Sequence, residues 1–146
     1  MATPHVEITI ARPTEDVFAV LTNVEHTGKW FPLNVEEHWT SAPPHGVGST
    51  RHAVIRMFGR RTENDAIVTE YDPPRRGVMV VDSAGSKFTV ALDFAAVHGG
   101  TRVDVNFDAD ARGIMRLAIG PFMAWYAGKF QKGLANLKAM MESGLI

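Results

Sequence analysis

The chain has 146 residues, of which 45% are hydrophobic and 21% charged, a composition typical of a globular protein. Fifteen Lys and Arg nearly balance sixteen Asp and Glu, so the net charge of -1 gives no overall attraction for nucleic acid or an anionic membrane. The absence of cysteine excludes disulfides, thiolate nucleophiles and cysteine metal sites. No apolar run approaches the roughly 20 residues needed to cross a bilayer, and no signal-peptide pattern begins the chain. We therefore expect one cytoplasmic domain, residues 1–146, with no stable membrane insertion and no nucleic-acid partner.

The N-terminal segment predicts one strand followed by two short helices. Residues 6–11 alternate apolar and more polar side chains, the period of a half-buried strand. Pro13, followed by two acidic residues, suits the first turn of a helix. Residues 23–32 predict a second short helix or turn that packs Trp30 and its neighbour Phe31 against a sheet.

The middle of the chain predicts six more strands joined by short turns. Phe88, Val90, Leu92 and Phe94 alternate with more polar residues, so this strand buries one face. Tight turns are expected at Gly59-Arg60, 83–86 and Gly99-Gly100, and consecutive hairpins imply an antiparallel meander. The predicted strands are residues 34–40, 49–58, 61–71, 77–82, 87–94 and 101–108.

From about Gly113 the period becomes helical, which predicts a long C-terminal helix. Gly120-Pro121 lies within this pattern, and proline disrupts a helix interior, so the helix either kinks there or starts near Pro121. One apolar stripe continues to the end of the helix at spacings of three and four residues, formed by Ile119, Met123, Tyr126, Phe130, Leu134, Leu137 and Met141.

Several of these elements carry a family resemblance. The order strand, two short helices, six strands, long helix resembles the START-like superfamily, and within it the SRPBCC group of polyketide cyclase/dehydrase and lipid-transport proteins. The resemblance implies the α+β helix-grip fold of birch-pollen allergens, in which a curved seven-stranded antiparallel sheet wraps around the long C-terminal helix. It also implies a cavity between sheet and helix that members use for lipids, sterols, polyketides or plant hormones. The matching pieces are Pro13-x-Glu15-x-Val17-Phe18, Trp30, Gly46-x-Gly48, residues 68–74 and residues 134–138.

Such a cavity would be lined by the helix stripe and by the apolar faces of the strands. We expect a small hydrophobic ligand to contact Trp30, Ile55, Met57, Val68, Val90, Leu92, Val103, Val105, Ile119, Met123, Tyr126 and Phe130.

No constellation of catalytic or metal-binding residues stands out. The six histidines show no His-x-x-x-His spacing, so we expect no metal, no cofactor and no catalytic residue. His52 has the opposite parity to Ala53 and Ile55 and should face solvent, whereas His38 stays undecided because Trp39 beside it is an equally good inward residue.

The sequence leaves open which polar side chains point into the cavity. Thr62, Asn64 and Glu70 share parity with Val68 and could place polar groups inside. The hydroxyl of Tyr126 could orient a ligand or bind a backbone carbonyl, with the structural role favoured.

We expect the protein to bind or transport a small hydrophobic or amphipathic molecule without catalysis. A polyketide aromatase or cyclase, and a protein-interaction or chaperone-cofactor module, are the alternatives. The first half of the last helix is apolar nearly all round, with Phe122 and Trp125 off the main stripe. It could line the cavity, contact a second copy of the chain or pack under the two short helices, and a homodimer contact is worth testing.

Overall fold

The computed structural model describes residues 4–83, 86–109 and 115–146, with the backbone alone for 115–119. The elements occur in the predicted order, one strand, two short helices, six strands and one long helix. Their bounds are β1 (His5–Ile10), α1 (Thr14–Thr22), α2 (Val24–Trp30), β2 (Asn34–Trp39), β3 (Thr50–Met57), β4 (Arg60–Asp72), β5 (Arg76–Ser83), β6 (Ser86–Val97), β7 (Gly100–Ala109) and α3 (Met115–Glu142).

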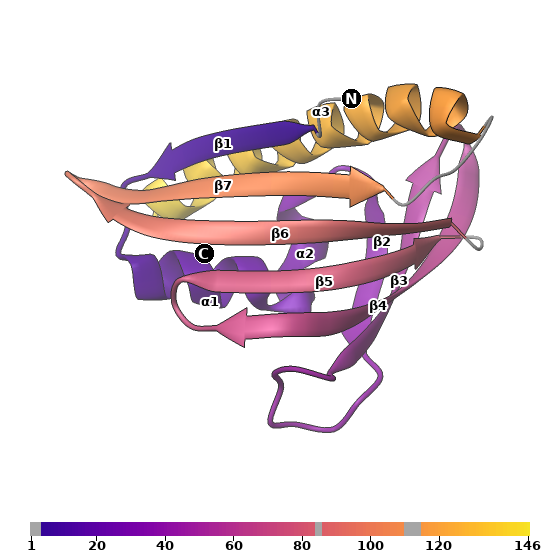
Figure 1. Ribbon diagram of the computed structural model, residues 1–146. Helices are drawn as coiled ribbons and strands as arrows, with labels where there is room; N and C mark the ends of the chain where they lie inside the picture. Colours follow the sequence, from indigo (N-terminus) through magenta and orange to yellow (C-terminus); the bar gives the residue numbers. More distant parts are fainter. Residues whose placement is uncertain (1–3, 84–85, 110–114) are drawn as a thin grey trace.

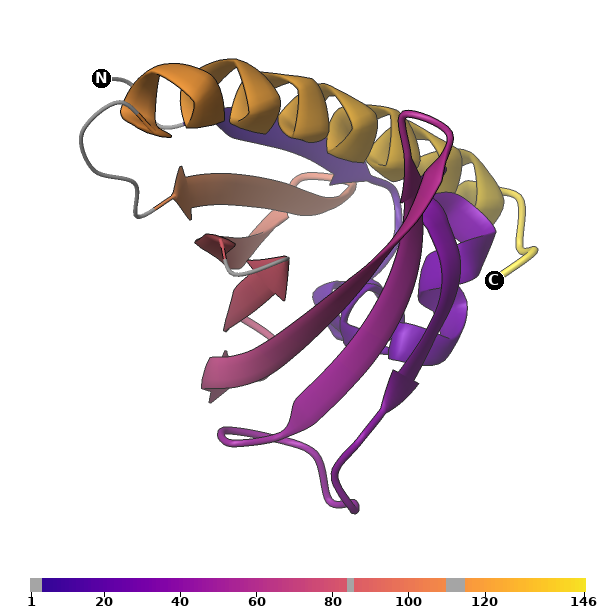
Figure 2. The ribbon, with the colours of Figure 1, turned by 90° about the vertical axis from the view of Figure 1, so that its right-hand side faces the viewer.

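The strands form one antiparallel sheet in the order β1-β7-β6-β5-β4-β3-β2. Strands β2 to β7 are a meander, and β1 pairs with β7 at one edge. The sheet curls so that β1 on one side and the β3–β4 hairpin on the other both approach α3, while α1 and α2 lie beside the enclosed space (Figures 1 and 2). The predicted helix-grip architecture is therefore confirmed.

The two short helices are separated by Asn23. Its side-chain oxygen accepts a hydrogen bond of 3.0 Å from the Glu25 amide, which caps the start of α2. Because α2 is only two turns long, its last residue, Trp30, is carried directly into the core, where 3% of its surface is exposed.

Helix α3 runs through Pro121 without ending. The alternative in which the helix starts near Pro121 is therefore wrong, because α3 begins at Met115; the kink stays a prediction. Burial of the apolar stripe compensates for the hydrogen bond that proline removes. Met123, Tyr126, Phe130, Leu134, Leu137 and Met141 are all buried, as the spacing predicted, whereas the side chain of Ile119 lies outside the described residues.

Helix α2 is fixed against α3 by a close approach at Gly133. A β-carbon on Gly133 would lie 3.0 Å from Cε3 of Trp30 and 3.2 Å from its carbonyl oxygen. One turn along the helix, Nδ2 of Asn136 donates a hydrogen bond of 3.2 Å to the same carbonyl. The glycine therefore sets how deeply Trp30 enters the space between the layers.

The β3–β4 turn differs from the prediction by one residue. Met57 pairs with Arg60, so the two turn residues are Phe58 and Gly59, and both have positive φ, 53° and 76°. This is the geometry of a tight hairpin turn in which asparagine or glycine is usual. The ring of Phe58 is 75% exposed and stacks on Trp125 of α3 with a centroid separation of 4.7 Å, which joins the hairpin tip to the helix.

Candidate ligand-binding site

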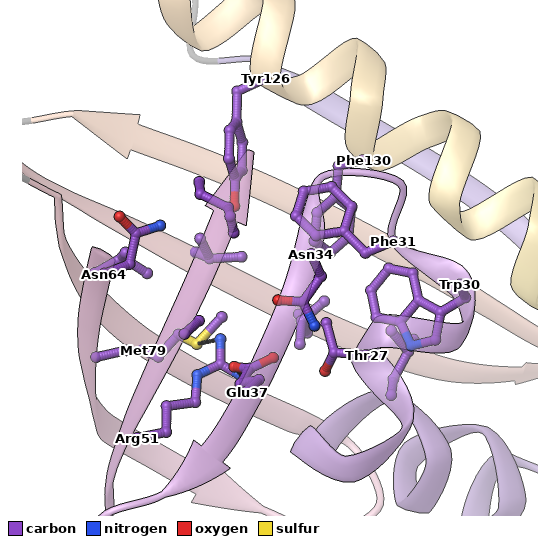
Figure 3. A pocket seen from close by; sticks show the side chains of 17 residues that line it. Thr27, Trp30, Phe31, Asn34, Glu37, Arg51, Asn64, Met79, Tyr126 and Phe130 are labelled. Carbon is purple, nitrogen blue, oxygen red and sulfur yellow. Dashed lines mark hydrogen bonds and ion pairs between the residues drawn. The ribbon is translucent and has the colours of Figure 1, made fainter. Parts of the chain in front are cut away.

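Two adjoining pockets lie in the space that the sheet and the helices enclose. The first, of about 50 Å³, is bounded by α2, α3 and the concave faces of β2 to β6 (Figure 3). The second, of about 70 Å³, lies toward the Trp39 and Tyr71 end of the sheet. Leu21, Arg51, Met79 and Leu92 line both pockets, so these side chains form the partition between them.

Seven of the twelve predicted ligand contacts line these pockets. Trp30, Ile55, Val90, Leu92, Tyr126 and Phe130 line the first pocket, and Val68 lines the second together with Leu92. Whether they contact a ligand stays a prediction.

Four other predicted contacts lie elsewhere. Met57, Val103, Val105 and Met123 are buried but line neither pocket. For Val103 and Val105 the reason lies at β7, where the ring of Phe107 packs edge-on against Phe130, with 5.4 Å between centroids. Strand β7 and α3 thus pack directly on each other. Ile119, the last of the twelve, lies outside the described side chains.

A buried ion pair crosses the partition. Nη1 of Arg51 on β3 lies 2.8 Å from Oε2 of Glu37 on β2, and the two side chains are only 16% and 3% exposed. The other terminal nitrogen of Arg51, Nη2, donates to the sulfur of Met79 on β5. Sequence reasoning missed both charged residues, although Arg51 has the same parity as the inward Ala53 and Ile55.

Three buried side-chain polar atoms have no hydrogen-bond partner in the described part of the chain, and all three belong to pocket residues. They are Nε1 of Trp30 and Oδ1 of Asn64 in the first pocket, and Nδ1 of His45 in the second. A buried polar atom without a partner costs about 1–3 kcal/mol, so such atoms mark positions where water or a ligand completes the hydrogen bonding. Asn64 is one of the three residues that strand parity allowed inside, and it lines the first pocket.

The hydroxyl of Tyr126 points from α3 into the first pocket, toward the side of Arg51 and Met79 (Figure 3). Burial raises the pKa of this hydroxyl, the nearby Glu37 raises it further, and Arg51 opposes the shift. The group therefore stays protonated at neutral pH and can donate a hydrogen bond. Its ring is held by edge-on contacts with Phe31 and Phe88, at centroid separations of 5.6 and 5.4 Å.

The strand histidines lie on the other side of the sheet. His52 bonds Asp65 at 2.8 Å and Glu63 at 3.3 Å, two exposed carboxylates, which confirms its outward orientation. The hydrogen bond to Asp65 raises the pKa of His52. His38 is exposed, and its neighbour Trp39 lines the second pocket, which resolves the open alternative.

The inward position considered for Glu70 is wrong. The pairing register of β4 with β5 shifts between Val68 and Glu70, because a bulge at this point reverses the alternation. The Glu70 carboxylate consequently lies 2.7 Å from Arg76 in an exposed ion pair, and Tyr71 takes the inward position and lines the second pocket. Thr62, the third polar residue of that parity, lines neither pocket.

Among residues 4–83, 86–109 and 115–146, one group has metal-ligand chemistry: His5, Glu7 and Asp104. It lies on the exposed surface of β1 and β7, away from both pockets. Arg102 forms ion pairs with both carboxylates, so a cation would have to compete with a guanidinium already in place.

Comparison with known proteins agrees with this architecture. A family profile described as "Polyketide cyclase / dehydrase and lipid transport" matches residues 1–142, and the chain belongs to this family. Comparison with functionally curated proteins gives no match.

Solved structures share the fold at low sequence identity. Ms6760 from Mycobacterium smegmatis superposes with a TM-score of 0.76 at 14% identity, over 97% of this chain and 92% of that one. The protein Ara h 8.0201 gives a TM-score of 0.66 at 15% identity, over 93% and 97% of the two chains. DynU16, from the dynemicin biosynthetic locus, gives 0.72 at 17% identity over 97% of this chain, which spans about half (48%) of DynU16. At these identities the likeness establishes the fold alone.

Proposed function

We propose that the protein binds or carries a small apolar or amphipathic molecule in the space between the sheet and α3, without catalysing a reaction on it. The observation that supports this best is the first pocket itself, a largely apolar enclosure with buried polar atoms that find no hydrogen-bond partner in the described part of the chain. Polar atoms without partners are rare in a well-packed core, whereas a binding site uses a few of them to orient its ligand.

The size of the pockets sets a condition on this function. Small-molecule sites typically measure about 300–1,000 Å³, whereas the two pockets are about 50 and 70 Å³. Joined, they would still measure only about 120 Å³, so a ligand must also move the side chains of the partition aside. Met79 is suited to such movement, since its side chain is unbranched and flexible.

Titration with the neutral fluorophore N-phenyl-1-naphthylamine tests the proposal. We expect saturable binding at one molecule per chain. Ala53→Leu adds three carbons inside the first pocket and should weaken binding by roughly tenfold or more. Ala95→Leu is the matched control, because Ala95 is exposed on β6, and it should leave the affinity unchanged. Absence of saturable binding, or equal affinity in the two variants, would contradict the proposal.

A polyketide aromatase or cyclase is the second candidate. It is favoured by one observation, the neutral Tyr126 hydroxyl pointing into a pocket that also contains Arg51, because such donors can stabilise a developing oxyanion. Its test is turnover of a poly-β-keto thioester analogue, with Tyr126→Phe as the inactive comparison. Equal turnover by both proteins would remove this candidate.

The remaining proposals concern location and assembly. The described residues include no helix long and apolar enough to cross a bilayer. We propose a cytoplasmic carrier acting as one domain. A homodimer through Phe122 and Trp125 stays a prediction, and Phe58 already covers one face of the Trp125 ring.

A further inference from the structure

We infer that the pocket selects a neutral ligand that carries a carbonyl or hydroxyl oxygen, and that Arg51, with its charge balanced by Glu37, binds that oxygen. The inference rests on the proposed binding function and narrows the class of ligand. It excludes both plain hydrocarbons and carboxylates, the charged form of fatty acids, as preferred ligands.

The hydrogen bonding of Arg51 is incomplete within the described residues. A guanidinium has five N–H donors in a planar fork. Nη1 faces the Glu37 carboxylate, but among the described residues Nη2 meets only the thioether sulfur of Met79, which is a weak acceptor. A ligand oxygen that takes the place of this sulfur would gain a charge-assisted hydrogen bond, and Met79 can move at low cost.

The position of this donor makes it part of the binding site. Arg51 and Met79 line both pockets, so the movement that admits a ligand is the movement that frees Nη2. Figure 3 shows the Arg51 head group beside Met79 and Glu37, below the inward-pointing Tyr126. An oxygen placed here would lie within the enlarged cavity rather than at its surface.

The charge balance of the Arg51–Glu37 pair disfavours an anionic ligand. The Glu37 side chain is 3% exposed and already neutralises Arg51, so the pair contributes no net charge to the pocket. A carboxylate ligand would lose its hydration and leave an excess negative charge beside Glu37, whereas a carbonyl or hydroxyl would not. The site therefore favours a neutral oxygen acceptor over a charged one.

Further polar atoms lie around the first pocket. Trp30 Nε1 is a donor and Asn64 Oδ1 an acceptor. Both are buried without partners among the described residues, and their own residues are 3% and 5% exposed. The Tyr126 hydroxyl is an additional donor. A ligand with more than one oxygen, one accepting and one donating, suits this set, while the rings of Phe31 and Phe130 provide an apolar enclosure.

The experiment compares three probes built on the same naphthalene ring system: naphthalene, 2-acetyl-6-hydroxynaphthalene and 6-hydroxy-2-naphthoate. Binding is measured by calorimetry at mildly acidic pH, where the naphthol groups are neutral and the carboxylate is charged. We expect the acetyl compound to bind at least roughly tenfold more tightly than each of the others, the effect of one good hydrogen bond to a charged group. Equal affinities, or a preference for the naphthoate, overturn the inference while leaving the proposed function standing. No binding of any probe contradicts both.

Glu37→Gln supplies a sharper form of the test. It leaves Arg51 with an unbalanced positive charge, so the preference should reverse and the naphthoate should bind more tightly than the acetyl compound. Glu36→Gln is the matched control, because Glu36 is the exposed neighbour on β2 and the net charge changes equally. It should keep the wild-type order. An unreversed order in folded Glu37→Gln overturns the inference, and if that variant does not fold, the order of the three probes on the wild-type protein decides.

Discussion

Replacing a glycine of α3 by alanine should have opposite effects on stability at two positions, Gly133 and Gly128. Gly133 is buried, and an added β-carbon would lie 3.0 and 3.2 Å from Cε3 and Cζ3 of Trp30. Gly128, five residues earlier, is exposed and would place its β-carbon in open space. Both are helical, so replacement by alanine gives each the same intrinsic gain of about 1 kcal/mol.

At Gly133, the contact with Trp30 determines whether alanine stabilises or destabilises the protein. Overpacking a filled interior costs about 1–3 kcal/mol. Trp30 has little freedom to retreat, because its ring is 3% exposed and packs edge-on against Phe130, with 5.4 Å between centroids. We therefore expect Gly133→Ala to be about 1 kcal/mol less stable than the wild type and Gly128→Ala about 1 kcal/mol more stable.

Thermal unfolding of the two variants measures this difference. A gap of about 2 kcal/mol corresponds to about 7 °C in a protein of this length. Because Trp30 lines the first pocket, Gly133→Ala should also weaken binding of N-phenyl-1-naphthylamine, while Gly128→Ala leaves it unchanged. Equal stabilisation by both substitutions would refute the close packing of α2 on α3.

Two further substitutions test the outer surface. The carboxylates of Asp65 and Glu63 raise the pKa of His52 above its ordinary value of 6.5, so the stabilisation is complete below that value and is lost as the pH rises through the raised pKa. Urea unfolding should therefore show a deficit for His52→Gln that is present in acid and disappears in alkali; a deficit independent of pH would contradict this. Phe58→Asn relieves the positive φ but removes the stack on Trp125, so stability should change by less than about 1 kcal/mol while the tryptophan emission shifts to the red. An unchanged spectrum would show that the two rings do not stack.

The fold could be predicted from the sequence because the apolar residues of each strand and of the long helix recur with the period of that element. The two-residue alternation in β6 and β7 and the three- and four-residue spacing in α3 reflect which face is buried, and the structure buries those faces. The predictions were wrong where an extra residue or a different turn residue shifts the alternation of inward and outward side chains. One extra residue in β4 turned Glu70 outward, and the choice of Phe58 as a turn residue moved the hairpin by one position.

The candidate site was less predictable, for two physical reasons. Parity shows which side chains point inward but not how far apart the layers lie, so Val103 and Val105, on β7 next to the edge strand β1, could not be distinguished from Val90, beside the pocket. Charged residues are usually outside, so Arg51 and Glu37 were not considered for the interior. Their inward positions become credible only when the two strands are seen side by side and each charge has its partner.

The most direct test of the account is a crystal structure of the protein grown with 2-acetyl-6-hydroxynaphthalene. The account predicts density for the probe between α3 and the concave face of the sheet, with Met79 displaced and the acetyl oxygen within hydrogen-bond distance of Arg51 Nη2. Density for the probe on the outer surface alone, for example against Phe58 and Trp125, with both small pockets and the Arg51–Met79 contact unchanged, would contradict it.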